Sequence, residues 1–252
     1  MTGINGGSAT NGVNGVNGAN SVRDVGVVIV AAGSSSRTGS NSTGELKQFR
    51  WIAGKPMLLH SLQTFQDRAD VAMVVCVLPP NVAGDPPPWL FQCDTERMLV
   101  AAGGAIRGES VRHGLEDLPE SCRFVLIHDA ARPLVSAEMI DRVVLETRKG
   151  HGAVAALPVV DTIKEVAASG RIVRTVDRTS LWRAQTPQGF PRDMILQAHR
   201  NALATGMDAT DDAALCEQLG LEVVVVRGSE RAMKITEEAD FLRADALQRL
   251  AE

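Results

Sequence analysis

The hydrophobic positions of this chain gather in short unbroken runs that alternate with longer amphipathic stretches. The runs are rich in valine, isoleucine and alanine, which is typical of strands buried on both faces of a sheet. They occupy 27–30, 71–78, 98–102, 123–128, 152–159 and 221–226. Apolar residues at helical spacing or helix-capping residues mark the stretches 56–65, 105–118, 136–148, 192–204, 210–219 and the region from 236 onward. This alternation predicts an α/β fold with a doubly wound, mostly parallel sheet.

One segment departs from the alternation of strands and helices. Between Asp161 and Thr179, apolar and polar residues alternate about a Ser169-Gly170 pair, which indicates a β-hairpin. A two-stranded ribbon is marginally stable alone, so we expect this arm, at about 159–180, to pack on something. A second copy of the chain is the obvious candidate. The polar and proline-rich stretches 79–89 and 181–191 are expected to be loops.

Composition narrows the class of protein. The 252 residues are enough for one α/β domain with a sizeable core. The net charge of −4 argues against broad nucleic-acid binding, and no apolar run approaches the ~20 residues of a membrane span. The four cysteines are scattered without a C-x-x-C pair. This scatter favours free thiols in a reducing compartment over disulfides or zinc ligands.

The first 24 residues are rich in glycine and asparagine, repeat the unit N-G-V and carry no charge before Arg23. Such a segment buries too little apolar surface to offset the entropy of ordering. We therefore expect a disordered tail over 1–24 and one folded domain over 25–252. The tail has neither the basic start nor the apolar centre of a signal peptide, so a cytoplasmic protein is expected.

Candidate chemistry follows the first buried strand directly. That strand runs into Ala31-Ala32-Gly33, then three serines and, across a polar loop, the cations Arg37 and Lys47. Small residues after a buried strand let backbone N–H groups approach an anion, and the cations can pair with a polyphosphate. The pattern is neither a Walker A loop nor a dinucleotide fingerprint, so it indicates a nucleotide without naming one. The alternative is an ordinary strand-to-helix turn with two solvated cations.

A second group of polar residues ends the strand at 123–128. Asp129 and Arg132 follow this strand, at the edge of an open parallel sheet where ligands bind. Asp129 can hold Mg²⁺ through oxygen, and Arg132 can grip a phosphate with two parallel hydrogen bonds. The alternative is an Asp–Arg pair that only ties a loop together. His128 has no obvious partner in the sequence, and we interpret it as structural.

Beyond these two stretches, a whole series of motifs occurs in a characteristic order. They are AAG…R…KQ, GGxxRxxSV, HDAARP, PVxDTIK, VDR, TPQ, TDD and KIT, and the resemblance that they carry spans about residues 25–247. In this respect the chain resembles the 2-C-methyl-D-erythritol 4-phosphate cytidylyltransferases of the non-mevalonate isoprenoid pathway. The resemblance implies that CTP, the co-substrate, is joined to methylerythritol 4-phosphate with release of pyrophosphate. It also implies Mg²⁺ or another divalent cation, and a homodimer formed through the hairpin arm.

The resemblance also assigns roles on the nucleotide side of the site. Arg37 and Lys47 would neutralise the charge that builds on the α-phosphate and the leaving pyrophosphate. The residues implied to line the triphosphate, ribose and base are Ala31, Ala32, Gly33, Ser35, Gly104, Ala105, Gly108, Ser110 and Ala130.

On the acceptor side, Asp129 would contact the substrate and lie beside Mg²⁺. Lys234 would bridge nucleotide and substrate and, with Arg178, hold the attacking phosphate in line. The residues implied to surround the sugar phosphate are Arg132, Thr186 and Thr210 from one subunit, and Thr162 and Arg178 from the arm of its partner.

The chain departs from the family pattern in several places, none of which removes a proposed catalytic charge. Ser35 stands where a second loop glycine is common, and Leu46 replaces a proline before the Lys-Gln pair. The loop from Arg37 to Lys47 is a few residues longer than usual. Ala105 replaces an acidic residue that some members carry near the base, so a backbone contact is expected there instead.

Three alternatives remain at this point. A ribitol-5-phosphate cytidylyltransferase would share the fold, the CTP loop and the mechanism. Its substrate would differ from methylerythritol 4-phosphate in chain length and in one branch methyl group. A Rossmann oxidoreductase or dinucleotide-binding module would need G-x-G-x-x-G and an acidic residue after the second strand, where this chain has Val77-Leu78-Pro79. A catalytically inactive nucleotide-binding regulator would retain the fold without turnover.

Overall fold

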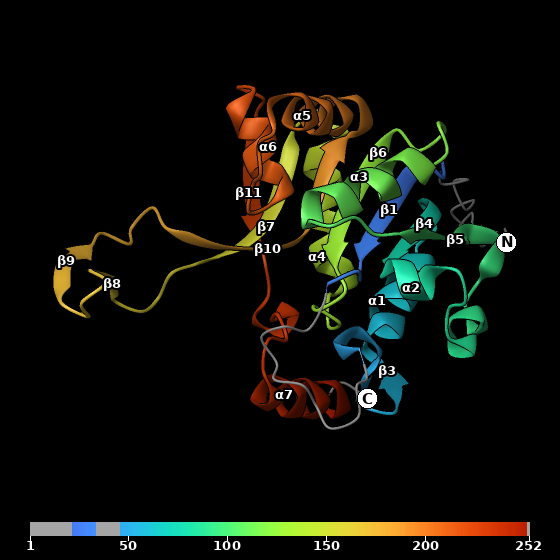
Figure 1. Cartoon of the computed structure of the whole chain (residues 1–252), viewed down its shortest axis with the longest axis horizontal. Helices are drawn as coiled ribbons and strands as arrows, with labels where there is room; N and C mark the ends of the chain where they lie inside the picture. The colour runs from blue at the N-terminus through green and yellow to red at the C-terminus, as the bar shows by residue number, and fades with distance from the viewer. Residues whose placement is uncertain (1–21, 34–45, 251–252) are drawn as a thin grey trace, which may run out of the picture.

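The computed structural model describes residues 22–33 and 46–250, and its centre is a seven-stranded sheet (Figure 1). Across the sheet the strands are β11 (Val223–Arg227), β7 (Gly152–Pro158), β10 (Trp182–Pro191), β6 (Phe124–Asp129), β1 (Val25–Val30), β4 (Val71–Leu78) and β5 (Met98–Ala102). All neighbours pair in parallel except β10, which is antiparallel to both β6 and β7. The predicted mostly parallel α/β sheet is therefore confirmed.

Helices cover both faces of this sheet, as a doubly wound fold requires. The helices are α1 (Met57–Gln66), α2 (Pro80–Ala83), α3 (Arg107–Asp117), α4 (Ala137–Arg148), α5 (Arg192–Thr205), α6 (Asp212–Gln218) and α7 (Glu238–Arg249). The apolar residues of α1 and α4 form one buried cluster with one face of the sheet, and those of α3, α5 and α6 form a second cluster with the other face. Successive residues of β1 alternate between the two clusters, because side chains along a strand point to opposite faces.

The C-terminal helix packs away from these two layers. A third apolar cluster joins Phe241 and Ala244 of α7 to Ile52 and Met57. Ile52 belongs to a small antiparallel pair of strands, β2 (Trp51–Ile52) and β3 (Lys55–Pro56), which lies beside α7 at one end of the molecule (Figure 1). The remaining turns are the 3₁₀ helices η1 (Lys47–Phe49), η2 (Pro88–Gln92), η3 (Thr95–Arg97) and η4 (Glu230–Ala232).

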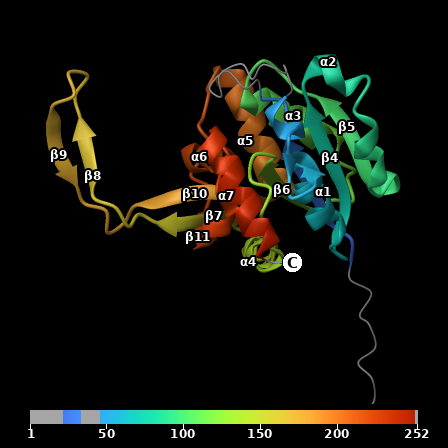
Figure 2. The ribbon, with the colours of Figure 1, turned by 90° about the horizontal axis from the view of Figure 1, so that it is seen from below.

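The predicted hairpin arm projects from the body as a separate two-stranded sheet (Figures 1 and 2). It consists of β8 (Ile163–Val166) and β9 (Ile172–Val176), and Gly170 adopts a φ of 81° at the turn. Apolar side chains on the arm remain exposed, including Val166 at 52% and Ile172 at 59%. The arm thus carries apolar surface that its own strands do not bury.

Two stretches that were expected to be loops form regular structure instead, so both predictions are wrong. The stretch 181–191 is not a loop but β10, a strand in the middle of the sheet. Gln185, Thr186 and Gln188 of this strand are polar yet buried, and their side chains hydrogen-bond neighbouring segments, so polarity does not mean exposure here. Ladder pairing is interrupted between Ala184 and Gln188, which accommodates Pro187. The stretch 79–89 also contains helical turns, α2 and the start of η2, since proline is favourable at the first position of a helix.

Helix starts were predicted with mixed success. Ser136 caps α4 as expected, accepting a hydrogen bond from the backbone N–H of Met139. Helix α7, however, has Glu237 rather than Thr236 at its N-cap. The carboxylate of Asp240 instead accepts hydrogen bonds from the backbone N–H groups of both Thr236 and Glu237.

The four cysteines are free thiols, as the scattered spacing predicted. In the described ranges, no helix is long and apolar enough to cross a membrane. The predicted tail lies almost entirely outside the described residues, and so do Ser35 and Arg37 of the first loop.

Candidate active site

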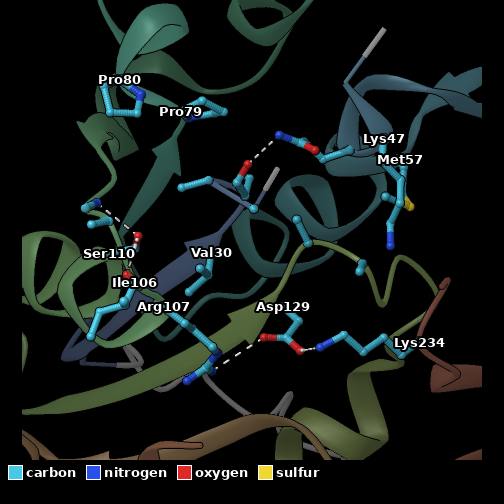
Figure 3. A pocket seen from close by; sticks show the side chains of 18 of the residues that line it. Val30, Lys47, Met57, Pro79, Pro80, Ile106, Arg107, Ser110, Asp129 and Lys234 are labelled. Carbon is cyan, nitrogen blue, oxygen red and sulfur yellow. Dashed lines mark hydrogen bonds and ion pairs between the residues drawn. The ribbon is translucent and has the colours of Figure 1, made fainter. Parts of the chain in front are cut away.

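A cavity of about 790 Å³ opens at the carboxyl ends of the central strands (Figure 3). This is the edge where ligands bind in open α/β sheets. Its walls come from the segments that follow β1, β4, β5 and β6, together with residues from η1 and from the loop before α7. The predicted residues that line it are Ala31, Ala32, Gly33, Lys47, Gly104, Ala105, Ser110, Asp129, Ala130 and Lys234.

One wall is built from small residues packed against one another. The backbone N–H of Ala31 donates to the carbonyl of Val77, and the carbonyl of Ala31 accepts from the buried side chain of Gln48 at 2.6 Å. A Cβ on Gly103 would lie 2.3 Å from the Cβ of Ala32, so only glycine lets the two segments approach this closely. The small residues predicted to cradle a phosphate therefore do bring the backbone to the cavity surface.

The first turn of α3 forms the next part of the wall. Ser110 Oγ accepts a hydrogen bond from the N–H of Gly104 at 3.1 Å and is placed to donate to the carbonyl of Ile106. Glu109 accepts from the N–H of Ala105 at 2.7 Å. A carboxylate from the following helix therefore contacts the backbone at position 105.

Asp129 lies between two cations, as Figure 3 shows. Lys234 Nζ contacts Asp129 Oδ2 at 2.8 Å, and Arg107 Nη2 approaches Oδ1 at 3.5 Å. Burial acts to raise the pKa of Asp129, but the positive charges of Arg107 and Lys234 outweigh it and hold the pKa well below its usual range. The carboxylate is therefore ionised at physiological pH and fixes Lys234 across the cavity.

Arg107 also pairs with a second, fully buried carboxylate. Its Nη2 lies 2.8 Å from Asp212 Oδ2, and the other oxygen of Asp212 lies 3.1 Å from His199 Nε2. Burial acts to lower the pKa of Arg107, but Asp212 and Asp129 together raise it, so the guanidinium stays charged. An arginine between two carboxylates links the start of α6 to the strand end that carries Asp129.

Arg107 and Asp212 were not predicted as site residues, although a signal existed for both. Arg107 is the arginine of the GGxxRxxSV motif, and Asp212 is the last residue of the TDD motif. Nothing in the sequence shows that these motifs meet, because they lie on different helices far apart along the chain.

Lys47 connects the beginning of the domain with its end. Its Nζ donates to the carbonyl of Ile235 at 2.5 Å, across 188 residues of sequence. Lys47 and Lys234 both line the cavity, so the two predicted catalytic lysines lie in the same site. Their side chains place two positive charges around the small-residue wall.

Several predicted residues support the cavity rather than line it. The buried hydroxyl of Thr186 accepts from the backbone N–H of Asp129 at 3.0 Å and lies 3.1 Å from His128 Nδ1. Arg132 donates to the carbonyls of Ala232 and Ala184, at 2.9 and 3.3 Å. Arg132 therefore ties neighbouring segments through backbone carbonyls, and the Asp129–Arg132 pair of the alternative interpretation is not among the ion pairs of the described residues. Burial lowers the pKa of His128 to about 4, in keeping with its structural interpretation.

Other predicted residues lie farther from the cavity. Gly108 is on α3 and lines a second, smaller cavity of about 190 Å³, and Thr210 is exposed just before α6. Thr162 and Arg178 are exposed at the foot of the arm, where Arg178 donates to the carbonyl of Val160. Within a single copy of the chain, these four are not part of the main cavity.

Comparison with known proteins agrees with this arrangement. The family described as "IspD: 2-C-methyl-D-erythritol 4-phosphate cytidylyltransferase" matches residues 25–249. A curated protein of that name from Streptomyces coelicolor is 43% identical over 230 residues, which cover 87% of this chain and 83% of that protein. A "Bifunctional enzyme IspD/IspF" from Rhodospirillum rubrum is 45% identical over 229 residues, and the match covers 89% of this chain but 57% of the relative.

A solved structure shows the same likeness in three dimensions. The crystal structure of 2-C-methyl-D-erythritol 4-phosphate cytidylyltransferase from Thermus thermophilus superposes with a TM-score of 0.75 at 35% identity, covering 90% of this chain and 99% of that one. The mixed seven-stranded sheet thus matches a solved cytidylyltransferase, and the fold is that of an α/β nucleotidyltransferase. Within this class, the chain belongs to the 2-C-methyl-D-erythritol 4-phosphate cytidylyltransferase family.

Proposed function

We propose that this protein transfers CMP from CTP to 2-C-methyl-D-erythritol 4-phosphate, giving 4-diphosphocytidyl-2-C-methyl-D-erythritol and pyrophosphate in isoprenoid precursor synthesis. Membership of the family supports the reaction. The observation that carries the mechanism is the convergence of Lys47, Lys234 and Asp129 on one cavity beside a wall of small residues. This arrangement suits two phosphate-bearing substrates that must meet.

The nucleotide would lie along the small-residue wall. Ala31, Ala32 and Gly33 would face the triphosphate, since their backbone reaches the cavity without bulky side chains. The base and ribose would lie against the segment from Gly104 to Ser110, at the start of α3. Backbone groups there have fixed positions because Ser110 and Glu109 hold them.

The reaction needs positioning and charge more than it needs proton transfer. A phosphate oxygen of the acceptor attacks the α-phosphorus of CTP, the bond to the β-phosphate oxygen breaks, and pyrophosphate leaves. Lys47, with Arg37 of the first loop, would stabilise negative charge on the α-phosphate and the leaving group. Lys234, held by Asp129, would orient the attacking phosphate in line. Thr186 would act on the same centre by fixing the backbone of Asp129.

A divalent cation such as Mg²⁺ fits this site as a companion of the triphosphate. The described residues contain no group of three acidic, histidine or cysteine side chains that could form a metal cage. Asp129 is the one acidic residue among those that line the described part of the cavity. Mg²⁺ commonly takes one or two carboxylates together with phosphate oxygens and water, so a single carboxylate suffices. When bound, the ion would supply further neutralisation of the triphosphate charge.

A homodimer would complete the site on the acceptor side. The arm projects from the body (Figure 2). Apolar side chains on it are exposed, and Thr162 and Arg178 lie at its foot. Packing of this arm on a partner would bury that apolar surface and bring both residues to the partner's cavity, where Arg132 and Thr210 would be neighbours of the sugar phosphate. We further propose a cytoplasmic location, which the four free thiols support.

The decisive experiment measures pyrophosphate release by the purified protein with CTP and Mg²⁺. Methylerythritol 4-phosphate and ribitol 5-phosphate are offered in parallel, with ATP, GTP and UTP as nucleotide controls. Turnover with CTP and methylerythritol 4-phosphate is expected. Preference for ribitol 5-phosphate would keep the mechanism and change the substrate, and no turnover with any pair would contradict the proposed function.

A further inference from the structure

The loop that carries Lys234 is held in place by a side chain from the middle of the sheet. Gln185, on β10, is buried with 6% of its surface exposed. Its Nε2 donates to the carbonyls of Ser229 and Ala232, at 2.9 and 3.3 Å, and its Oε1 accepts from the N–H of Ser229 at 3.1 Å. One amide side chain thus holds both ends of the turn η4 that precedes Lys234.

The loop packs against this amide as closely as a backbone can. A Cβ on Gly228 would lie 2.2 Å from Gln185 Oε1 and 3.1 Å from the carbonyl oxygen of Ala156, so a larger residue there displaces the Gln185 amide or the loop. The N–H of Gly228 in turn donates to the carbonyl of Ala156 on β7 at 2.8 Å. The entry of the loop is therefore fixed against both β7 and β10.

Other contacts also hold the backbone beside Lys234, among them the bond from Lys47 Nζ to the carbonyl of Ile235. Arg132 donates to the carbonyl of Ala232, and the N–H of Ile235 donates to the carbonyl of Ala131 at 2.8 Å. The Lys234 side chain itself is 46% exposed, so packing does little to hold it. Its ammonium meets Asp129 from a stretch of backbone that is anchored on both sides.

We propose that Gln185 is a positioning residue for the transfer reaction, acting through Lys234. It holds the loop 228–232 so that the ammonium of Lys234 meets Asp129 and the acceptor phosphate. This inference rests on the proposed function, since it assigns Lys234 to that reaction. Without the amide the loop loses three hydrogen bonds at its entry, and Lys234 then occupies a wider range of positions.

The first test compares Gln185→Met with a matched control. Methionine preserves the length of the side chain and removes its hydrogen bonds. Gln66 is similarly buried, at 5% exposed, and likewise exchanges hydrogen bonds with a loop, through the N–H and carbonyl of Asp94, but that loop contributes no residue to the described cavity lining. Both variants should lose similar thermal stability. Only Gln185→Met should lose kcat, by about 10- to 100-fold, because small misplacements of a catalytic group are costly.

A double-mutant cycle separates positioning from general damage. In a Lys234→Ala background, Gln185→Met should lower kcat/KM by less than about twofold, because the group that it positions is already gone. Gly228→Ala disturbs the same contact from the loop side and provides a second variant if Gln185→Met does not fold. It should show the same selective loss of kcat.

Amide hydrogen exchange supplies a readout that does not depend on turnover. Exchange over 229–236 should accelerate in Gln185→Met and stay at the wild-type rate in Gln66→Met. A wild-type protein without turnover would overturn the proposed function, while the exchange comparison would still decide whether Gln185 holds the loop. Three results would each overturn this inference. They are unchanged exchange over 229–236 in Gln185→Met, a kcat of Gln185→Met equal to that of Gln66→Met, and a Gln185→Met loss of kcat/KM that is as large in the Lys234→Ala background as in the wild type.

Discussion

At the scale of single residues, the site depends on charges that are fixed before any substrate arrives. Asp129 is ionised because Arg107 and Lys234 flank it, and Arg107 is in turn held by the buried Asp212. Lys47 is tied to the backbone of Ile235. Charges held in this way need little reorganisation when negative charge develops on a phosphate. Such preorganisation is the main source of electrostatic catalysis.

Removal of one such charge should show in the rate. Lys47→Ala is expected to lower kcat by about 100-fold or more while the fold persists, because the stabilisation of the leaving pyrophosphate is lost. Steady-state kinetics with a thermal melt measure both effects. Lys55→Ala is the control, since Lys55 is an exposed lysine that bonds only Gln63 among the described contacts. Near-normal turnover of Lys47→Ala would remove this lysine from the catalytic group.

Removal of Arg107 should change how stability depends on pH. The pKa values of Asp129 and Asp212 are lowered in the folded protein, so their ionised forms contribute stability above about pH 4 that is lost as the pH falls. Arg107→Met leaves Asp212 buried without its cation, and burial then raises the pKa of that carboxyl. The variant should lose about 2–4 kcal/mol of unfolding free energy at pH 7 and a smaller amount near pH 5.

Chemical denaturation at the two pH values tests this expectation. Arg112→Met is the matched control, because Arg112 lies on the same helix but pairs with the exposed Glu116. It should cost well under about 1 kcal/mol at either pH. A deficit in Arg107→Met that is equal at pH 5 and pH 7 would show that the buried carboxylates do not respond to the missing charge.

At the scale of elements, the packing of helix α3 on the sheet sets where the part of the cavity wall at its N-terminal end lies. A Cβ on Gly114 would lie 2.5 Å from Val28 Cγ1 and 2.9 Å from Val77 Cγ2, so the helix rests directly on β1 and β4. Gly114→Ala should therefore lower the free energy of unfolding by about 1–3 kcal/mol through overpacking. This would occur even though alanine favours a helix by about 1 kcal/mol over glycine.

The same helix offers its own control for this prediction. A Cβ on Gly108 would meet nothing within 4 Å, so Gly108→Ala should leave stability unchanged or raise it. Urea denaturation of the two variants makes the comparison. Equal effects would mean that the helix moves freely over the sheet. The CTP affinity of Gly108→Ala also tests the predicted nucleotide contact at this position.

The elements differ in how far the sequence predicts them. Buried parallel strands such as β1 and β4 are evident, because both of their faces are apolar and the runs are unbroken. Strand β10 is not evident, because Gln185, Thr186 and Gln188 are polar and yet buried: their hydrogen-bond partners lie on segments that only the folded chain brings near. The meeting of Arg107 with Asp212 escapes prediction for the same reason.

The proposed catalytic groups are easier to predict than the residues that support them. Lys47, Asp129 and Lys234 lie in recognisable motifs, and the structure places all three on one cavity. Local pattern does not show that Arg132 and Thr186 bond the backbone around that cavity, since both act across the sheet. Motifs therefore identify the charges, whereas long-range contacts decide how each charge is held.

At the scale of the whole molecule, the arm makes a prediction about assembly. If Arg178 serves the partner's cavity, inactive Arg178→Ala and Lys47→Ala subunits should regain activity when combined. One of the two sites in such a heterodimer has both an intact Lys47 and an intact Arg178 from the other subunit. Turnover of about half the wild-type value per dimer is therefore expected.

Differently tagged subunits purified as heterodimers provide the measurement. Each variant homodimer, carried through the same exchange and purification, is the control. Persistent inactivity in verified heterodimers would mean that each cavity uses only its own chain.

The bond between Lys47 and Ile235 also has a consequence for protein synthesis. A ribosome synthesises the small residues 31–33 and Lys47 early. The carbonyl of Ile235, which accepts the hydrogen bond from Lys47, is synthesised 188 residues later. A nascent chain can thus form most of the sheet before Lys47 and Lys234, the proposed phosphate-binding lysines, come together. Under the proposed function, competence for chemistry is acquired only after the segment carrying Lys234 has left the exit tunnel and docked.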